Sequence, residues 1–222
     1  MVTEARGAHR GAGELTHMTR IGVLALQGDF REHLRAVERL GAEGRAVRLP
    51  RDLDGLDGLI IPGGESTVMG KLMVAYDLDQ PLRERIAAGL PTWGTCAGLI
   101  LLARETDNAM AGQPLLAAMD IRVCRNAFGA QRESFEVDLD VPTLGEQPVH
   151  AVFIRAPIVE SVGAGVDALA RVEPGLFGAP GEIVAVRQGP LLGTAFHPEV
   201  TNDVRFHSYF LSIVREATAV AR

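Results

Sequence analysis

Short apolar runs alternate with amphipathic stretches along the first half of the chain. The run Ile21–Leu26 is followed by Phe30–Leu40, in which apolar residues recur three or four positions apart. This order predicts a strand and then a helix. It returns at the apolar runs Leu59–Ile61 and Pro91–Trp93, each of which leads through glycines into a helical stretch. Strands and helices in this order imply a mostly parallel sheet covered by helices on both faces.

The remaining elements of this half follow from capping and turn residues. Ser66 is a good N-cap, and proline is favoured in the first turn of a helix. We therefore predict an extended piece at Ala46–Leu49, a helix starting at Ser66, and helices at Pro81–Ala88 and Leu99–Ala103.

The second half of the chain has a different pattern, with short apolar or alternating runs separated by turn residues. One amphipathic stretch near the end, Asn202–Ala217, predicts a final helix. The fold class is therefore α/β, a three-layer sandwich in which the second half adds antiparallel or mixed strands to the sheet. The strands predicted there are Asp120–Cys124, Ser134–Leu139, Val149–Ile154, Ile183–Val186 and Leu191–Phe196.

The length of 222 residues suits one domain with a substantial core. Residues 1–18 are rich in glycine, alanine and charge and show no periodicity, so they predict either a disordered leader or an upstream start that precedes Met18. No internal repeat or long linker divides the rest, and we expect a single domain over residues 19–222.

Composition narrows the partners and the compartment. The formal net charge of −6, without a cluster of basic residues, argues against nucleic-acid binding. No apolar run reaches the length of a membrane span. Two cysteines cannot form a disulfide framework, and no secretory signal is evident, so we expect a cytoplasmic protein.

The segment Gly94-Thr95-Cys96-Ala97-Gly98 has the pattern of a nucleophile elbow with sulfur as the nucleophile. It follows a predicted strand and precedes a predicted helix. On such a sharp corner, side chains at the two glycine positions would collide with the neighbouring strand and helix. The helix N-terminus also favours a thiolate over a thiol. Cys96 is therefore the candidate nucleophile.

A base for this thiol is predicted in Phe196-His197-Pro198-Glu199. A free thiol is only a few per cent ionised at neutral pH, so a nearby base is needed. Pro198 holds His197 extended, and residues two apart in an extended segment point the same way. Glu199 can then orient the imidazole of His197.

The loop Pro62-Gly63-Gly64-Glu65-Ser66-Thr67 is the third candidate element. Two glycines between a strand and a helix can turn backbone N–H groups into a pocket, as an oxyanion site requires. A phosphate-binding P-loop is the competing interpretation. Its spacing fails, because Gly70-Lys71 is followed by Leu72 and has Glu65 where the first glycine belongs.

No residue pattern predicts a metal site, and no cofactor is expected. Cys124 lacks flanking glycines and is interpreted as a core residue. The histidines outside the Phe196–Glu199 segment are predicted to be structural: His9, His17, His33, His150 and His207.

Together, the three elements resemble the triad, or class I, glutamine amidotransferases, which have a flavodoxin-like fold. The resemblance narrows to the family of glutaminase subunits of pyridoxal 5′-phosphate synthase and extends from about Arg20 to the final helix. One departure is Ala130, where many relatives are expected to have a polar or basic residue. The matching segments are Gly22–Gly28, Pro62–Thr67, Gly94–Gly98, Arg125–Gly129, Phe153–Pro157 and Phe196–Glu199.

The resemblance implies a role for each matching position. Cys96 would be the nucleophile, His197 the base and then the acid, and Glu199 the orienting carboxylate. The backbone N–H groups of Gly64 and Ala97 would form the oxyanion hole. The residues implied to bind glutamine are Gly64, Glu65, Ser66, Arg125, Ile154 and Arg155.

The resemblance also implies a reaction and a partner. L-glutamine would be hydrolysed to glutamate and ammonia through a glutamyl thioester. The ammonia would pass, within a hetero-oligomeric complex, to a synthase (lyase) subunit that makes pyridoxal 5′-phosphate from ribose 5-phosphate and glyceraldehyde 3-phosphate. Three alternatives remain at this stage: a glutaminase that serves another synthase, a non-catalytic scaffold subunit, and a cysteine hydrolase acting on another amide or a peptide.

Overall fold

A computed structural model describes residues 18–108, 110, 112–125, 134–173 and 181–220. Its main sheet has the strand order β2-β1-β3-β4-β12-β11-β9-β6-β5, with β10 paired to β11. The strands from β2 to β12 in this order are parallel to their neighbours, whereas β11 is antiparallel to β9, β10 and β12. The predicted α/β class and mostly parallel sheet with antiparallel additions are thus confirmed.

The first half of the chain alternates strands and helices, as its hydrophobic pattern predicts. Its elements are β1 (Arg20–Leu24), α1 (Phe30–Arg39), β2 (Glu43–Val47), β3 (Gly58–Ile61), α2 (Ser66–Ala75), α3 (Asp79–Ala87), β4 (Thr92–Thr95) and α4 (Ala97–Leu102).

The second half is mainly strands and ends in one long helix. Its elements are β5 (Ala103–Asp107), β6 (Met119–Cys124), β7 (Ser134–Leu139), β8 (Val149–Ile154), β9 (Ile158–Val162), β10 (Asp167–Arg171), β11 (Ile183–Gln188), β12 (Leu191–Thr194) and α5 (Arg205–Val220).

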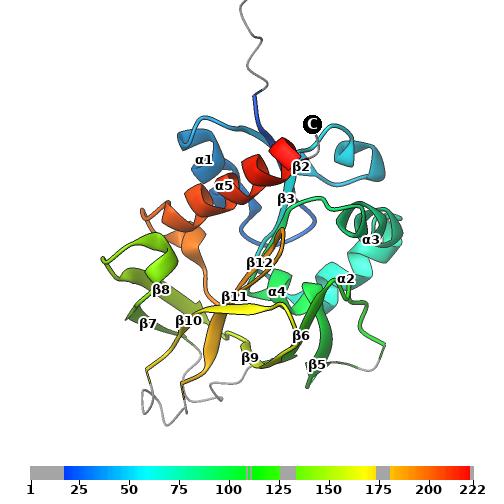
Figure 1. Cartoon of the computed structure of the whole chain (residues 1–222). Coiled ribbons are helices and arrows are strands. Elements are labelled where there is room, and N and C mark those ends of the chain that lie inside the picture. The colour runs from blue at the N-terminus through cyan, green and yellow to red at the C-terminus, as the bar shows by residue number, and fades with distance from the viewer. Residues whose placement is uncertain (1–17, 109, 111, 126–133, 174–180, 221–222) are drawn as a thin grey trace, which may run out of the picture.

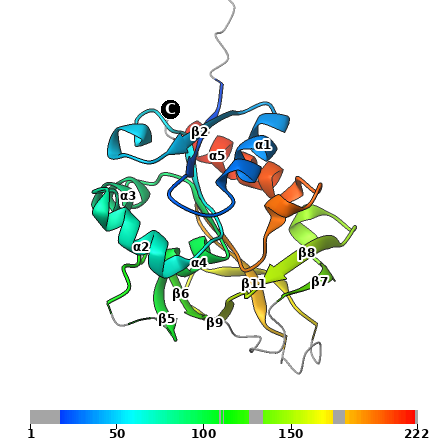
Figure 2. The same cartoon turned by 180° about the vertical axis from the view of Figure 1, so that it is seen from behind.

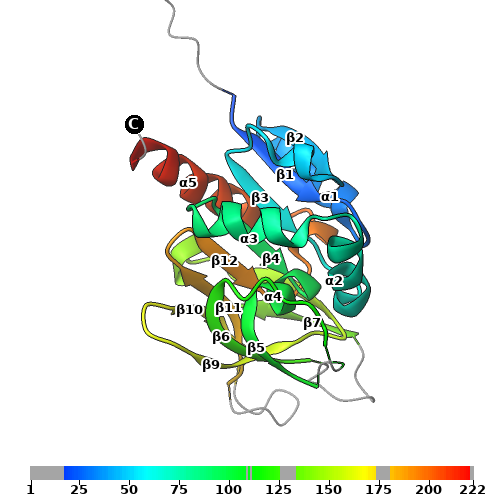
Figure 3. The same cartoon turned by 90° about the vertical axis from the view of Figure 1, so that its right-hand side faces the viewer.

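The helices form layers on the two sides of the main sheet. Figures 1 and 2 show α1 and α5 together on one face, and α2, α3 and α4 grouped on the other. The side view in Figure 3 shows the β5, β6 and β9 end of the sheet below these helices. On the α1 and α5 side, the fully buried Trp93 packs against Phe206 and Phe210 of α5, with ring centroids 6.3 and 5.8 Å away. This packing fixes the position of β4, and the turn at Cys96 follows directly after this strand.

Two of the predicted strands do not join the main sheet. Ser134–Leu139 and Val149–Ile154 pair with each other as a separate antiparallel ribbon, β7–β8. The ribbon packs on the domain through Phe153 of β8, which lies 5.5 Å from the ring of Phe196. The prediction that these strands extend the sheet was therefore wrong.

The cap of α2 also differs from the prediction. The helix begins at Ser66, but its N-cap is Glu65, whose carboxylate accepts hydrogen bonds from the N–H groups of Thr67 and Val68 at 3.3 and 2.8 Å. A glutamate carboxylate satisfies two free amides and also complements the positive end of the helix. Ser66 is consequently free to present its hydroxyl elsewhere.

The predicted leader lies outside the described residues, except for the exposed Met18. Among the helices that the structure describes, none is both long enough and apolar enough to cross a membrane.

Candidate active site

Cys96 lies on a strained corner between β4 and α4. Its backbone has φ 47° and ψ −101°, a region that non-glycine residues rarely adopt. A side chain at Gly98 would overlap the backbone carbonyl oxygen of Ile61 in β3, and one at Gly94 would meet the backbone of Gly98 at 2.5 Å. Both glycines are therefore required by close backbone contacts, for the reason that the sequence predicts.

His197 and Glu199 follow the end of β12. The Nδ1 atom of His197 lies 2.8 Å from Oε1 of Glu199, and both residues are buried. Pro198–Val200 forms a 3₁₀ turn, so the segment is not extended throughout as predicted. The turn still brings the carboxylate to Nδ1 of the imidazole.

The environment of His197 favours its charged form. Burial lowers the pKa of His197, but hydrogen bonds and negative charge from Cys96 and Glu199 outweigh burial and raise it from 6.5 to about 10. Burial raises the pKa of Glu199, and the hydrogen bond and positive charge of His197 oppose that effect. The geometry thus favours an imidazolium held between a sulfur and a carboxylate.

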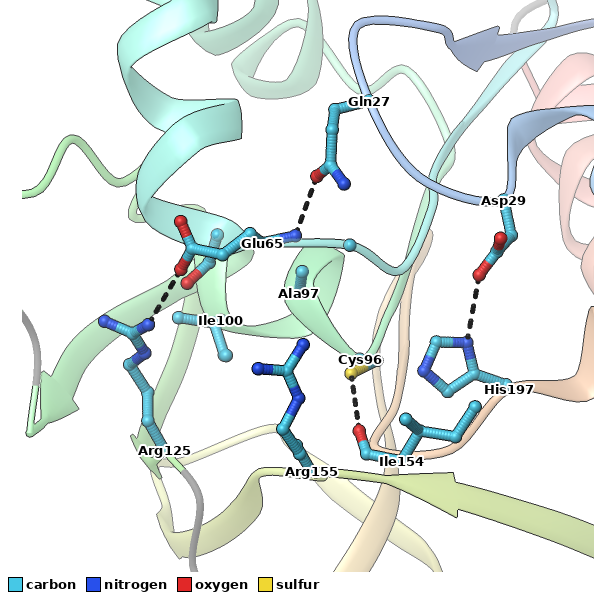
Figure 4. A pocket seen from close by; sticks show the side chains of 12 residues that line it. Gln27, Asp29, Glu65, Cys96, Ala97, Ile100, Arg125, Ile154, Arg155 and His197 are labelled. Carbon is cyan, nitrogen blue, oxygen red and sulfur yellow. Dashed lines mark hydrogen bonds and ion pairs between the residues drawn. The ribbon is translucent and has the colours of Figure 1, made fainter. Parts of the chain in front are cut away.

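These groups open into one cavity of about 230 Å³. Figure 4 shows Cys96 and His197 facing each other across it. The Sγ atom of Cys96 is 3.9 Å from the carbonyl oxygen of Ile154, at the end of β8. A cavity of this size suits a small metabolite and cannot enclose a folded macromolecule.

The glycine loop forms the wall opposite Ile154. Glu65 N–H donates to Oε1 of Gln27 at 2.7 Å, which fixes the loop against the segment after β1. A side chain at Gly63 would overlap the imidazole of His197, and Gly64 has φ +153°. The loop therefore approaches the histidine at a distance that only glycine allows.

The two predicted arginines lie on the cavity wall in different states. The guanidinium of Arg125 is 3.1 Å from a carboxylate oxygen of Glu65 and 2.9 Å from Oε1 of Gln113. Arg155 follows β8 with φ 45° and makes no hydrogen bond or ion pair with any residue that the structure describes. Among the described residues, the guanidinium of Arg155 thus has no ion-pair partner, whereas that of Arg125 is paired with Glu65.

The cavity brings together all the residues that the sequence predicts for the site, apart from Glu199, which lies behind His197. Sequence reasoning missed three residues that also line it. The Gly22–Gly28 motif could have suggested Gln27, but nothing in the pattern distinguishes Asp29 or Ile100. The lining residues are Gln27, Asp29, Gly64, Glu65, Ser66, Cys96, Ala97, Ile100, Arg125, Ile154, Arg155 and His197.

Asp29 gives the site its one possible metal-binding arrangement among the described residues. Its carboxylate lies 3.8 Å from Nδ1 of His197, and ligand atoms of Asp29, His197 and Glu199 lie within 4.8 Å of one another. The hydrogen bond between Nδ1 of His197 and Oε1 of Glu199 already pairs one of the candidate ligand atoms of each residue.

Two sequence interpretations outside the cavity have different outcomes. Cys124 is only half-buried, at the end of β6, with its sulfur 3.4 Å from Nδ2 of Asn108, so it is not a core residue. The motif residues 126–129 and the departure at Ala130 lie outside the described residues.

The fold and the cavity are those expected of a glutamine amidotransferase. Comparison with known families gives the same class of protein. The model of the SNO glutamine amidotransferase family matches residues 23–216, and the chain belongs to this family.

Individual relatives are more specific. The chain is 58% identical over 197 residues to the protein named pyridoxal 5′-phosphate synthase subunit PdxT in Clavibacter sepedonicus, covering 89% of this chain and 91% of the relative. The PdxT of Moorella thermoacetica is 55% identical, with 88% and 99% covered.

Solved structures agree with the fold. A crystal structure of a glutamine amidotransferase, 50% identical, superposes with a TM-score of 0.79 over 87% of this chain and 98% of its own. A chain in the structure of PurLQS from Thermotoga maritima, 18% identical, shares the fold with a TM-score of 0.62 over 88% of this chain and 98% of its own.

Proposed function

We propose that this chain is the glutaminase subunit of pyridoxal 5′-phosphate synthase and hydrolyses L-glutamine to L-glutamate and ammonia. The proposal rests on one observation. Cys96, on its strained corner, and His197, which is hydrogen-bonded to Glu199, line the same small cavity. The names of relatives at 54 to 58% identity support the synthase assignment. They do not favour a glutaminase for another synthase. We also propose that residues 19–222 form one glutaminase domain.

In the first half of the reaction, the thiolate of Cys96 attacks the amide carbon of glutamine. The carbonyl oxygen becomes an oxyanion, for which the N–H groups of Gly64 and Ala97 are the proposed donors. The carbon–nitrogen bond then breaks, and the imidazolium of His197 gives its proton to the departing ammonia. The product of this half is a glutamyl thioester on Cys96.

In the second half, water attacks the thioester carbon and His197 accepts a proton from the water. The carbon–sulfur bond then breaks, which releases glutamate and restores the thiolate of Cys96. Thioester formation removes the negative charge of the sulfur, which is one of the causes that raise the pKa of His197. The pKa of the imidazole therefore falls at the stage where a base is needed. Glu199 keeps the ring oriented throughout.

The charges of the cavity suit a free amino acid. The guanidinium of Arg155 has no ion-pair partner among the described residues, and we propose that it binds the α-carboxylate of glutamine. The Arg125–Glu65 pair and Ser66 also line the cavity, and Gln113 donates to Ser66 Oγ at 3.2 Å. This arrangement favours a zwitterion over a peptide, which would need an open groove.

The partner we propose is the synthase subunit, which would receive the ammonia inside a hetero-oligomer and combine it with ribose 5-phosphate and glyceraldehyde 3-phosphate. Both cysteines are free, as expected for a protein of the reducing cytoplasm.

The test is glutamate release by the chain mixed with its synthase partner. Cys96→Ala is expected to reduce the rate by at least about a thousandfold, because the covalent route is lost. Cys124→Ala removes the other thiol and is the matched control, expected to keep wild-type rates. Hydrolysis that survives Cys96→Ala would refute the proposal and favour a scaffold role.

A further inference from the structure

A pair of buried histidines lies directly behind the carboxylate of Glu199. His33 of α1 and His207 of α5 are fully or almost fully buried, and Nδ1 of His33 lies 3.0 Å from Nε2 of His207. The other nitrogen of His33, Nε2, lies 3.4 Å from Oε2 of Glu199 and 3.3 Å from Oγ1 of Thr95.

Glu199 has one oxygen in need of a donor. Oε1 is bonded to His197, whereas Oε2 is buried and accepts no hydrogen bond of good geometry from the residues that the structure describes. Nε2 of His33 lies 3.4 Å from this oxygen. An unsatisfied buried oxygen of an ionised carboxylate is costly, so a donor at this position matters for the charge of Glu199.

Both histidines are neutral in this environment. Burial is the main cause that lowers the pKa of His33 well below its usual value, and repulsion between a charged His33 and a charged His207 or His197 acts in the same direction. Burial also lowers the pKa of His207, to about 4, with Arg39 acting in the same direction and Asp203 opposing it. Each ring therefore carries a single N–H, and one proton lies between them.

Of the two ways to place these protons, one satisfies more groups. If His33 carries its proton on Nε2, this N–H can donate to Thr95 and also faces Oε2 of Glu199, 3.4 Å away, while Nδ1 accepts from Nε2–H of His207. The remaining atom, Nδ1 of His207, then has only an unused lone pair. The opposite placement points a lone pair at the carboxylate and leaves a buried N–H without an acceptor, which is rarer in proteins.

We infer that His33 is a positioning residue of the active site: its Nε2–H holds Oε2 of Glu199, and His207 sets the tautomer of His33. The inference rests on the proposed function, because it extends the pair His197–Glu199 to the chain His197–Glu199–His33–His207. A neutral donor at this point keeps Glu199 ionised and oriented without placing another positive charge beside His197.

The competing explanation is that the two rings are ordinary core packing. Trp93 lies edge-on to both, with centroids 5.5 Å from His33 and 4.9 Å from His207. Packing alone requires the ring shape but neither a given tautomer nor an effect on His197, so the two explanations differ in what they predict.

The first measurement uses the unmodified chain without glutamine or partner. Nitrogen-15 NMR of the imidazoles is expected to find His33 protonated on Nε2 and bare on Nδ1 from pH 6 to 8. Protonation on Nδ1 would overturn the inference. Because no turnover is involved, this result stands or falls separately from the proposed glutaminase activity.

The second measurement compares two amide replacements of the same ring. In His33→Gln the amide nitrogen takes the place of Nε2, whereas in His33→Asn it takes the place of Nδ1 and leaves Glu199 without a donor. We expect His33→Asn to lower kcat about tenfold to a hundredfold with little change in KM, and His33→Gln to recover most of the loss. His150→Asn, at an exposed histidine of β8, is the control.

NMR titration of His197 in the free variants completes the test and covers the case in which a variant is poorly active for other reasons. The pKa of His197 is expected to fall in His33→Asn and to stay near the wild-type value in His33→Gln. Equal pKa values and equal kcat in the folded Asn and Gln variants would overturn the inference. An inactive wild-type complex would refute the proposed function alone.

Discussion

At the scale of residues, the two arginines of the cavity differ in their pairing. Arg125 forms an ion pair with Glu65, whereas Arg155 has no ion-pair partner in the part of the chain that the structure describes. We expect Arg155→Ala to lower kcat/KM for glutamine about tenfold to a hundredfold, mainly through KM, since a charge-assisted hydrogen bond contributes roughly 1.5–3 kcal/mol.

The measurement for Arg155 is steady-state glutamate release at varied glutamine concentration. Arg45→Ala is the control, because Arg45 lies on β2 outside the cavity with its guanidinium 3.7 Å from Glu43. An unchanged KM in Arg155→Ala would contradict the assignment of the α-carboxylate.

His197 predicts a pH dependence of stability. Its pKa is raised from 6.5 to about 10 in the folded chain, so the folded state binds the proton more tightly than the unfolded state. The resulting stabilisation is fully present below pH 6.5 and is lost as the pH rises through 10. We expect the free energy of unfolding of the wild type, relative to His197→Gln, to decrease between pH 7 and pH 10.

Urea unfolding at a series of pH values measures this difference. In Cys96→Ala, which removes one of the groups that raise the pKa of His197, the decrease should be smaller. A difference between wild type and His197→Gln that does not vary with pH would show that the imidazole is not charged in the folded state.

Sequence reasoning selected Cys96, His197 and Glu199, which the structure brings together, because the chemistry proposed for them imposes local patterns. Cys96 needs glycines on both sides, and Glu199 is near His197 in the chain. Asp29 and His33 carry no such pattern, since they reach the site only when α1 packs beside the turn after β12. Their contribution depends on tertiary contacts that no local spacing records.

At the scale of elements, the cysteine turn is held by close contact between α4 and β3. Gly98→Ala places a methyl group on the backbone oxygen of Ile61, which cannot move without shifting the strand. We expect a loss of about 1–3 kcal/mol or more in the free energy of unfolding, measured by urea denaturation.

Gly44→Ala is the matched control for this prediction. Its added methyl meets only the end of the Leu34 side chain closely, at 3.0 Å, and Leu34 can rotate. We expect a change within about 1 kcal/mol, because alanine is also less costly to order in a strand than glycine. Equal losses in the two variants would mean that the contact with Ile61 does not set the cost.

The elements missed by sequence reasoning are those with little buried surface. β5 (Ala103–Asp107) is at the edge of the sheet, and β9 and β10 are mostly exposed along their lengths. An edge strand needs few apolar residues, so its sequence lacks the alternation that marks β6 or β8. The ribbon β7–β8 was recognised as two strands, but its separation from the sheet depends on pairing that hydrophobicity does not encode.

At the scale of the whole molecule, we expect the chain to be far less active alone than with its synthase partner. The glycine loop that would supply an oxyanion donor is joined to the segment after β1 by the hydrogen bond from Glu65 N–H to Gln27. We expect a docked partner to reposition the loop by exchanging this bond.

The measurement is glutamate release by equal amounts of chain with and without the synthase partner, at saturating glutamine. An increase in kcat of at least about tenfold is expected on addition, since one oxyanion donor alone contributes roughly 2.7–4 kcal/mol. Addition of an unrelated protein at the same concentration is the control, and equal rates with and without the synthase partner would contradict partner activation.

The position of β8 has a geometric consequence for the cavity. Its Val152 carbonyl accepts from His197 N–H at 2.9 Å, its Ile154 carbonyl faces the sulfur of Cys96, and Arg155 follows at its end. His197 and Cys96 thus both contact β8, and Arg155 follows directly after it. A displacement of β8 relative to the main sheet would change the surroundings of all three groups at once, so the docking of the ribbon and the alignment of the cavity are coupled.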